Sequence, residues 1–275
     1  MRDLQDKFVI VTGASTSSGI GRAVALRLAR EGANLLLVAD RTEAQLAEAA
    51  EECSAVEGCG EVHSAVFDLG LAGMPEEMVA LADKIFGRVD ILINNAGLRA
   101  PFDFGEYDRE TFDRMISVNI GAAFFAGQAV LPLMRAAGGG RIINVSSQLA
   151  YVTAPQRALY GLTKAALVHL TKSMAAELCK DNIIVNSVSP GPVATNPLQD
   201  MGIDSMRDKF NPGRNVMSVD SVAGIPWNSD MISKVPVGRL ATVQEIADVV
   251  FFLAAGAPGF LMGQDIIVDG GYVLR

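Results

Sequence analysis

The chain has 275 residues, of which 50% are hydrophobic, and a formal net charge of −8 at pH 7. This length suits one large α/β domain or two small ones, and the acidic balance without a block of lysines and arginines argues against non-specific nucleic-acid binding. The three cysteines, Cys53, Cys59 and Cys179, are too few for a disulfide framework, and no histidine partner lies near the first two, so we predict a reducing compartment and no metal site.

Short β-rich apolar runs alternate with longer helical patterns along the chain. Because most of the apolar runs lack a clean alternation, they suit strands of a parallel sheet that is buried on both faces. The alternation predicts right-handed crossovers and a doubly wound, Rossmann-like sheet of about seven strands with helices on both faces. We find no repeat or linker and predict one domain over residues 1–275. The expected strands are 8–11, 35–38, 62–67, 91–93, 141–145, 183–187 and 266–268, and the expected helices are 20–31, 42–56, 75–86, 108–136, 158–180 and 243–255.

The N-terminal residues run from a short polar lead into the first strand, without the apolar region of a signal peptide. The longest apolar runs, such as 249–257, are much shorter than the roughly 20 residues that cross a bilayer. We therefore expect a soluble, cytoplasmic protein with no membrane partner.

One segment, 196–235, interrupts the alternation of strands and helices. It carries four methionines and the only tryptophan, Trp227, and is too apolar for a disordered tail. We predict a substrate-binding lid over an apolar pocket; a contact between subunits is the alternative.

The stretch "VTGASTSSGIGRA" at 11–23 joins the first strand to the first helix. Gly13, Gly19 and Gly21 let the backbone approach a phosphate, and the helix N-terminus adds free N–H groups and a partial positive charge. In this position the glycines predict a site for a dinucleotide pyrophosphate. An ordinary strand-to-helix turn is the alternative.

The second strand ends in "LLLVADR", with Asp40 followed by Arg41. In dinucleotide-binding sheets an acidic side chain here accepts hydrogen bonds from ribose hydroxyls, whereas a basic one favours a 2′-phosphate. Asp40 therefore favours NAD, and Arg41 keeps NADP as the alternative.

The segment "INVSSQLAYVTAPQRALYGLTKAAL" carries the predicted chemistry. Tyr160 and Lys164 share one face of a helix, and Ser147 lies at the end of the fifth strand, where open sheets present residues to ligands. A free phenol titrates near pH 10, and an ammonium about 4 Å away stabilises a phenolate by roughly 4 kcal/mol at an effective dielectric of about 20. Such a pair suits proton exchange near neutral pH. Ser146 is a rival for Ser147.

These segments, together with "NNAG" at 94–97, Asn119 in "ISVNIG" and "SPGPVAT" at 189–195, resemble the short-chain dehydrogenase/reductase family over nearly the whole chain. The glycine loop departs from the usual family form, because five residues rather than three separate Gly13 from Gly19. The resemblance implies an NAD- or NADP-dependent enzyme that interconverts a secondary alcohol and a carbonyl. It also implies a homo-oligomer, a tetramer or dimer, with helices 108–136 and 158–180 at one interface.

The resemblance further implies roles for single residues. Ser147 would hydrogen-bond the substrate oxygen, Tyr160 would exchange a proton, Lys164 would tune Tyr160 and hold the nicotinamide ribose, and Asn119 would anchor a water relay. Asp68 would contact the adenine, with a turn cap as its alternative. The implied cofactor contacts are Gly13, Ser15, Ser18, Gly19, Ile20, Gly21, Asp40, Arg41, Asp68, Leu69, Asn95, Ala96, Gly97, Tyr160, Lys164, Pro190, Gly191, Val193 and Thr195.

The apolar lid suggests a bulky, largely uncharged substrate. Arg99 could meet a carboxylate or phosphate, but we expect it to be solvated. His63 and His169 lie in no setting typical of a triad or a metal site. Two other functions stay open: a dinucleotide-binding redox sensor without turnover, and a reductase of C=C or C=N bonds.

Overall fold

The computed structural model describes residues 3–40, 43–195 and 232–274. The predicted lid therefore lies outside the described residues except for 232–235. The strands are β1 (Phe8–Thr12), β2 (Asn34–Ala39), β3 (Val62–Val66), β4 (Ile91–Asn94), β5 (Gly140–Val145), β6 (Ile183–Pro190) and β7 (Asp265–Val268). The α-helices are α1 (Ile20–Arg30), α2 (Glu43–Ser54), α3 (Met74–Phe86), α4 (Arg109–Ile116), α5 (Ala122–Ala129), α6 (Leu131–Ala136), α7 (Ala158–Leu178) and α12 (Val243–Phe251).

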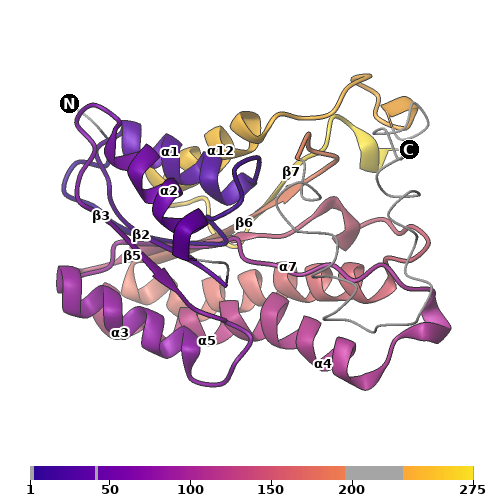
Figure 1. The fold of residues 1–275 in the computed structure, drawn as a ribbon, viewed down its shortest axis with the longest axis horizontal. Helices are drawn as coiled ribbons and strands as arrows, with labels where there is room; N and C mark the ends of the chain where they lie inside the picture. Colours follow the sequence, from indigo (N-terminus) through magenta and orange to yellow (C-terminus); the bar gives the residue numbers. More distant parts are fainter. Residues whose placement is uncertain (1–2, 41–42, 196–231, 275) are drawn as a thin grey trace.

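The seven strands form one parallel sheet in the order β3-β2-β1-β4-β5-β6-β7. Figure 1 shows α1, α2 and α12 on one face of the sheet and α3, α4, α5 and α7 on the other. The strand order reverses between β1 and β4, and ligands of such sheets bind at this point, beyond the carboxyl ends of the strands. The predicted fold class is confirmed.

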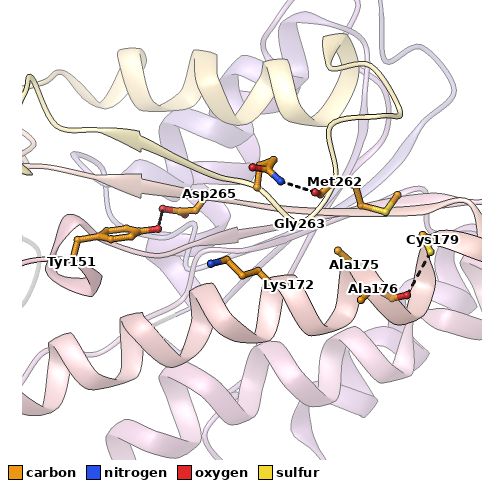
Figure 2. Close-up of a pocket in the computed structure, with 9 residues that line it drawn as sticks. Tyr151, Lys172, Ala175, Ala176, Cys179, Met262, Gly263 and Asp265 are labelled. Atoms are coloured by element: carbon orange, nitrogen blue, oxygen red, sulfur yellow. Dashed lines mark hydrogen bonds between the residues drawn. The ribbon is translucent and has the colours of Figure 1, made fainter.

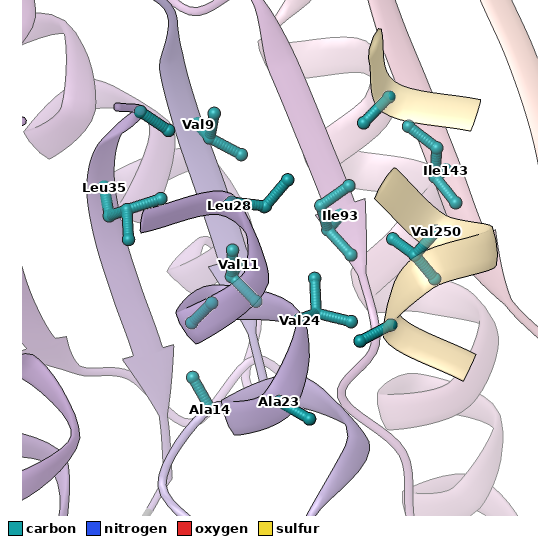
Figure 3. Packing of buried hydrophobic residues seen from close by; sticks show 14 of the residues in the cluster. Val9, Val11, Ala14, Ala23, Val24, Leu28, Leu35, Ile93, Ile143 and Val250 are labelled. Carbon is teal, nitrogen blue, oxygen red and sulfur yellow. The ribbon is translucent and has the colours of Figure 1, made fainter. Parts of the chain in front are cut away.

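Two apolar layers hold the helices to the sheet. Val9 and Val11 of β1 lie on one face of the sheet, where they pack in one cluster with Val24 and Leu28 of α1 (Figure 3). Ile10, between these two valines, belongs to the cluster on the other face. A strand that is apolar on both faces is what burial under two helical layers requires.

The predicted helix 108–136 is divided into three helices. A π-helical turn, η2 (Ser117–Gly121), separates α4 from α5, and such turns often occur at functional sites. A second break at Val130 precedes Pro132, which has no N–H to continue the hydrogen-bond ladder. In the same way α12 continues only as a π-helical turn, η5 (Phe252–Gly256). Helical periodicity in the sequence does not distinguish a π turn from a regular helix.

By length and composition alone, the stretch Arg109–Ala136 would qualify as a membrane span. Its helices form part of the layer that covers the sheet in Figure 1, where α5 packs against α3. An apolar helix that packs in the core of a soluble protein passes the same test.

Candidate active site

The glycine loop brings bare backbone to the N-terminus of α1. Gly13 has a φ of +69°, and a Cβ on it would lie 2.8 Å from Asn95 Nδ2. A Cβ on Gly21 would collide with the carbonyl oxygen of Gly13. Only glycine therefore fits at either position. The resulting cradle of backbone at a helix N-terminus suits the phosphates of a dinucleotide.

Thr12, at the end of β1, joins this loop to the "NNAG" turn. Its buried hydroxyl accepts hydrogen bonds from Asn95 N (2.9 Å) and Ala96 N (3.0 Å) and donates to Ile93 O (3.2 Å). In the opposite direction, the Asn95 side chain donates hydrogen bonds to Thr12 O (2.9 Å) and Gly13 O (3.1 Å). Thr12 is not among the predicted site residues, although a hydroxyl at the end of a buried strand is a detectable signal.

Arg22 supports the glycine loop from behind and was also missed. Its guanidinium is buried. It donates hydrogen bonds to Ser15 O through Nη1 (3.4 Å) and to the Glu52 carboxylate through Nε (2.9 Å). Ser15 is buried as well, while Ser18, Gly19 and Ile20 are half-buried at the start of α1.

The acidic residues after β2 and β3 differ in their surroundings. Asp40 is exposed directly beyond the end of β2, and Arg41 lies outside the described residues. Asp68 accepts a hydrogen bond from Gly70 N (3.1 Å) and forms an ion pair with Arg114 (2.7 Å). The carboxylate of Asp68 thus has structural partners already, and its contact with adenine stays a prediction, as does that of the buried Leu69.

The end of β5 and the first turns of α7 bring the predicted catalytic residues together. Lys164 is 3% exposed; its Nζ donates to Val145 O (2.9 Å) and lies 5.6 Å from the centroid of the Tyr160 ring. Ser147 follows Val145 by two residues. Burial lowers the pKa of Lys164, nearby Tyr160 acts in the opposite direction, and Arg99 lowers it further.

The two neighbouring serines have different partners. The Ser146 hydroxyl donates to Lys164 O (2.9 Å), which fixes α7 against the strand end. Ser147 Oγ accepts a hydrogen bond from Leu149 N (3.2 Å), and its hydroxyl hydrogen has no acceptor among the described residues. Ser147 is therefore the serine whose hydroxyl can donate to a ligand.

Asn119 lies in the η2 turn and is buried. Its side chain accepts from Leu98 N (2.7 Å) and donates to Leu98 O (2.9 Å) and to Thr163 Oγ1 (3.0 Å). A Cβ on Gly97 would lie 3.4 Å from Lys164 Nζ and 3.6 Å from Asn119 Oδ1. The turn that holds Gly97 thus adjoins the lysine.

The turn after β6 closes the site. Gly191 N donates to Val268 O (2.9 Å), and a Cβ on Gly191 would lie 2.9 Å from Gln148 Oε1. Gln148 Oε1 and Ser189 Oγ are buried and have no hydrogen-bond partner in the described part of the chain. Beyond Pro190, Ala194 N donates to Ala241 O (2.8 Å) and Thr195 N donates to the carbonyl of the buried Val193 (2.8 Å).

A separate hollow of about 650 Å³ lies between α7 and the start of β7 (Figure 2). Tyr151 donates to Asp265 there (2.8 Å), and burial together with this carboxylate raises the pKa of the Tyr151 hydroxyl. The hollow contains none of the predicted catalytic residues. Tyr151 is therefore a poor candidate for proton exchange.

Known proteins match almost the whole chain. A family model described as "short chain dehydrogenase" matches residues 7–205, and one described as "Enoyl-(Acyl carrier protein) reductase" matches residues 215–273. Gluconate 5-dehydrogenase of Gluconobacter oxydans is 33% identical over 95% of this chain and 93% of its own. D-beta-hydroxybutyrate dehydrogenase of Rhizobium meliloti is 29% identical over 98% of this chain and 99% of its own.

Solved structures of short-chain dehydrogenases share the fold of this chain. A putative short-chain alcohol dehydrogenase from Sinorhizobium meliloti superposes with a TM-score of 0.85 at 30% identity, covering 99% of this chain and 98% of its own. A putative NAD(P) dependent gluconate 5-dehydrogenase from Beutenbergia cavernae, with bound NADP, gives a TM-score of 0.81 at 29% identity and covers 100% of both chains. The chain belongs to the short-chain dehydrogenase/reductase family of NAD(P)-dependent oxidoreductases that act on alcohol and ketone groups.

Proposed function

We propose that this protein interconverts a secondary alcohol and a ketone, with Tyr160 as the group that exchanges the proton. One observation carries the proposal: the buried Lys164 Nζ is fixed to Val145 O beside the Tyr160 ring, at the strand end that also presents Ser147. A positive charge at this place stabilises a phenolate.

Each residue has a task that follows from its contacts. The Ser147 hydroxyl donates a hydrogen bond to the substrate oxygen, and Tyr160 takes the alcohol proton or returns it to the ketone oxygen. Lys164 holds the phenolate in place electrostatically. Asn119 has both amide hydrogens engaged but keeps one lone pair on Oδ1, which can accept a hydrogen bond from a water of a proton relay.

The cradle at Gly13 and Gly21 and the unpartnered oxygens of Gln148 and Ser189 fit a bound dinucleotide. When bound, a nicotinamide dinucleotide accepts or donates the hydride. The residues that would hold it are those of the glycine loop, the 94–97 turn, Lys164 and the turn at 190–195. Asp40 favours NAD over NADP, because a carboxylate repels a 2′-phosphate.

The finer assignments of substrate, assembly and location remain proposals as well. An apolar substrate body is supported by the composition of segment 196–235 and by the partly buried Leu98 and Tyr107 beside Tyr160. Homo-oligomerisation through α5 and α7 is supported by the exposed Phe124, Phe125 and Leu162, as apolar patches of this kind often mark interfaces. We expect a soluble cytoplasmic protein.

Reduction of a C=C bond is a second candidate, favoured by the enoyl reductase description of the family model that matches residues 215–273. The same proton donor would serve it. A panel of enoyl thioesters with reduced cofactor, beside the alcohols and ketones, separates the two reactions by product.

The proposal is tested by following the absorbance of the reduced nicotinamide over panels of alcohols and ketones. Tyr160→Phe should lower kcat by roughly 100-fold or more, which is the range of general acid–base catalysis. Tyr151→Phe is the matched control, because it removes a hydroxyl that faces Asp265, and it should retain activity. Turnover that survives Tyr160→Phe would contradict the proposal, and cofactor binding without turnover on any panel member would favour a redox sensor.

A further inference from the structure

Two basic residues, Arg157 and Lys164, lie beside Tyr160, and a third, Arg99, lies close to both of them. Arg157 is the N-cap residue of α7 and precedes Tyr160 by three positions, so the two side chains are neighbours on the helix. Arg99 follows the turn that adjoins Lys164, and its charge lowers the pKa of both Arg157 and Lys164. Burial is the larger cause of the lowered pKa of Arg157. Arg99 is thus close enough to act electrostatically on both of the other two groups.

No carboxylate compensates this charge within the described part of the chain. The guanidinium of Arg157 donates to Gln156 O (3.1 Å), a neutral acceptor, and Arg99 has no hydrogen bond or ion pair with a described residue. By contrast, Arg22, Arg114 and Arg135 all form ion pairs with acidic side chains. In a chain of net charge −8, acidic partners are in good supply. The excess of positive charge is therefore local to the surroundings of Tyr160.

The backbone directly before each arginine has a defined conformation. Both backbone polar groups of Leu98, directly before Arg99, are hydrogen-bonded to the Asn119 side chain. Gln156, directly before Arg157, has a φ of +61°, a conformation that costs energy for a residue other than glycine and that clusters at functional sites. The N-terminus of α7 adds its partial positive charge to the same place.

Like charges held together in a partly desolvated site cost free energy unless an anion joins them. Uncompensated cationic clusters beside a reactive group are typical of anion-binding sites. Two guanidinium groups match the hydrogen-bonding capacity of a carboxylate.

We propose that Arg99 and Arg157 form a subsite for a carboxylate of the substrate, so that the alcohol presented to Tyr160 belongs to a hydroxy acid. This inference rests on the proposed function. It replaces the expectation that the substrate is largely uncharged. The Arg99 side chain is exposed, as expected, and is therefore accessible to a substrate carboxylate. An apolar body of the substrate would still find Leu98 and Tyr107 beside the subsite. The carboxylate takes no part in the bond changes.

The test compares matched probes on the full chain in the presence of NAD: 3-hydroxybutyrate against methyl 3-hydroxybutyrate, and gluconate against gluconamide. Binding is measured by calorimetry and turnover by the absorbance of the reduced nicotinamide. At least one acid should exceed its neutral partner in affinity and in kcat/KM by roughly 10- to 100-fold, the range of hydrogen bonds to charged groups. Arg157→Gln and Arg99→Gln should each remove most of this preference, and Arg157→Lys should keep part of it.

Arg135→Gln is the control, because Arg135 lies on α6, outside the cluster, and forms an ion pair with Asp181 after the end of α7. The proposal is overturned if no acid exceeds its neutral partner, or if the preference survives both glutamine variants. It is also overturned if these variants weaken NAD binding instead, which would assign the arginines to the cofactor phosphates. A preference for 3-hydroxybutyl phosphate over both acids would contradict the choice of a carboxylate.

Tyr160→Phe distinguishes failure of the subsite from failure of the proposed function. This variant should lose turnover while it retains the calorimetric preference for the acid. Turnover that persists in Tyr160→Phe contradicts the proposed function alone, because the binding preference is measured independently.

Discussion

Thr12→Val would test whether the glycine loop and the "NNAG" turn act as one unit. Valine has nearly the shape of threonine, so the substitution removes the hydroxyl and little else. Thr12 is 1% exposed, and its hydroxyl takes part in three hydrogen bonds, with Ile93 O, Asn95 N and Ala96 N. All three backbone groups lose their partner in the variant.

The expected loss of stability follows from these contacts. Each hydrogen bond contributes a net value of about 0.5–1.5 kcal/mol, which gives about 1.5–4.5 kcal/mol for three. Asn95 and Ala96 are half-buried, so water can replace part of the loss, and we expect about 2.5 kcal/mol. With an unfolding entropy of about 2.1 cal/mol/K per residue, a chain of 275 residues should then melt about 4 °C lower.

Thermal and urea unfolding measure the stability, and fluorescence titration measures the Kd for NAD, which should rise because the two loops lose their fixed relation. Thr12→Ser keeps the hydroxyl and is the matched control; it should lie much closer to the parent protein in both measurements. A free energy of unfolding of Thr12→Val within about 0.5 kcal/mol of the parent protein, the ordinary effect of a surface substitution, would contradict this role of the hydroxyl.

Three further predictions concern the scaffold of the site. Gly21→Ala places a methyl group against Gly13 O and should raise the Kd for NAD by roughly tenfold, whereas Gly105→Ala, with open space around its Cβ, should not change it. Burial raises the pKa of Cys53 to about 12, so between about pH 9 and pH 12 only the unfolded chain ionises this thiol. The free energy of unfolding of the parent protein, relative to that of Cys53→Ala, should therefore fall by roughly 1.4 kcal/mol per pH unit in that range. A thiol reagent should also modify the exposed Cys179 well before the buried Cys53. Thr242→Ala removes the side-chain cap of α12 and should cost about 1 kcal/mol in urea unfolding, and a loss of less than about 0.3 kcal/mol would contradict the assigned cap.

The sequence predicted those parts of the fold that depend on local pattern and on the alternation of strands and helices along the chain. All seven strands follow from apolar runs, because strands that are buried on both faces consist of nearly continuous hydrophobic residues. The position of the glycine loop follows from Gly13, Gly19 and Gly21. The division of 108–136 was missed, since a π turn needs no residue that a regular helix excludes. The roles of Thr12 and Arg22 were missed as well, because their partners Ala96 and Glu52 lie far away in the sequence.

The predicted substrate class differs from the inferred one for a related physical reason. In the sequence, Arg99 and Arg157 are 58 positions apart, and each one alone resembles a solvated surface residue. Only the fold brings the segment after β4 close to the N-terminus of α7, where the charge of Arg99 acts on Arg157. Composition therefore predicted an apolar substrate from segment 196–235, while the described residues favour an anionic one.

The division of labour within the site has a structural origin. Lys164 is held by the end of β5 twice: its Nζ donates to Val145 O and its own carbonyl accepts from Ser146. The residues proposed to exchange the proton are thus anchored to the parallel sheet, and substitutions of Lys164 would disturb the contact between β5 and α7. The groups that would recognise a substrate, Arg99 and Arg157, lie just outside these elements, on a turn and at a helix cap. Substitutions there can change which alcohol is accepted while the chemistry stays the same. Exchange of Arg99 and Arg157 for neutral residues should therefore change the choice between acid and ester far more than it changes the melting temperature.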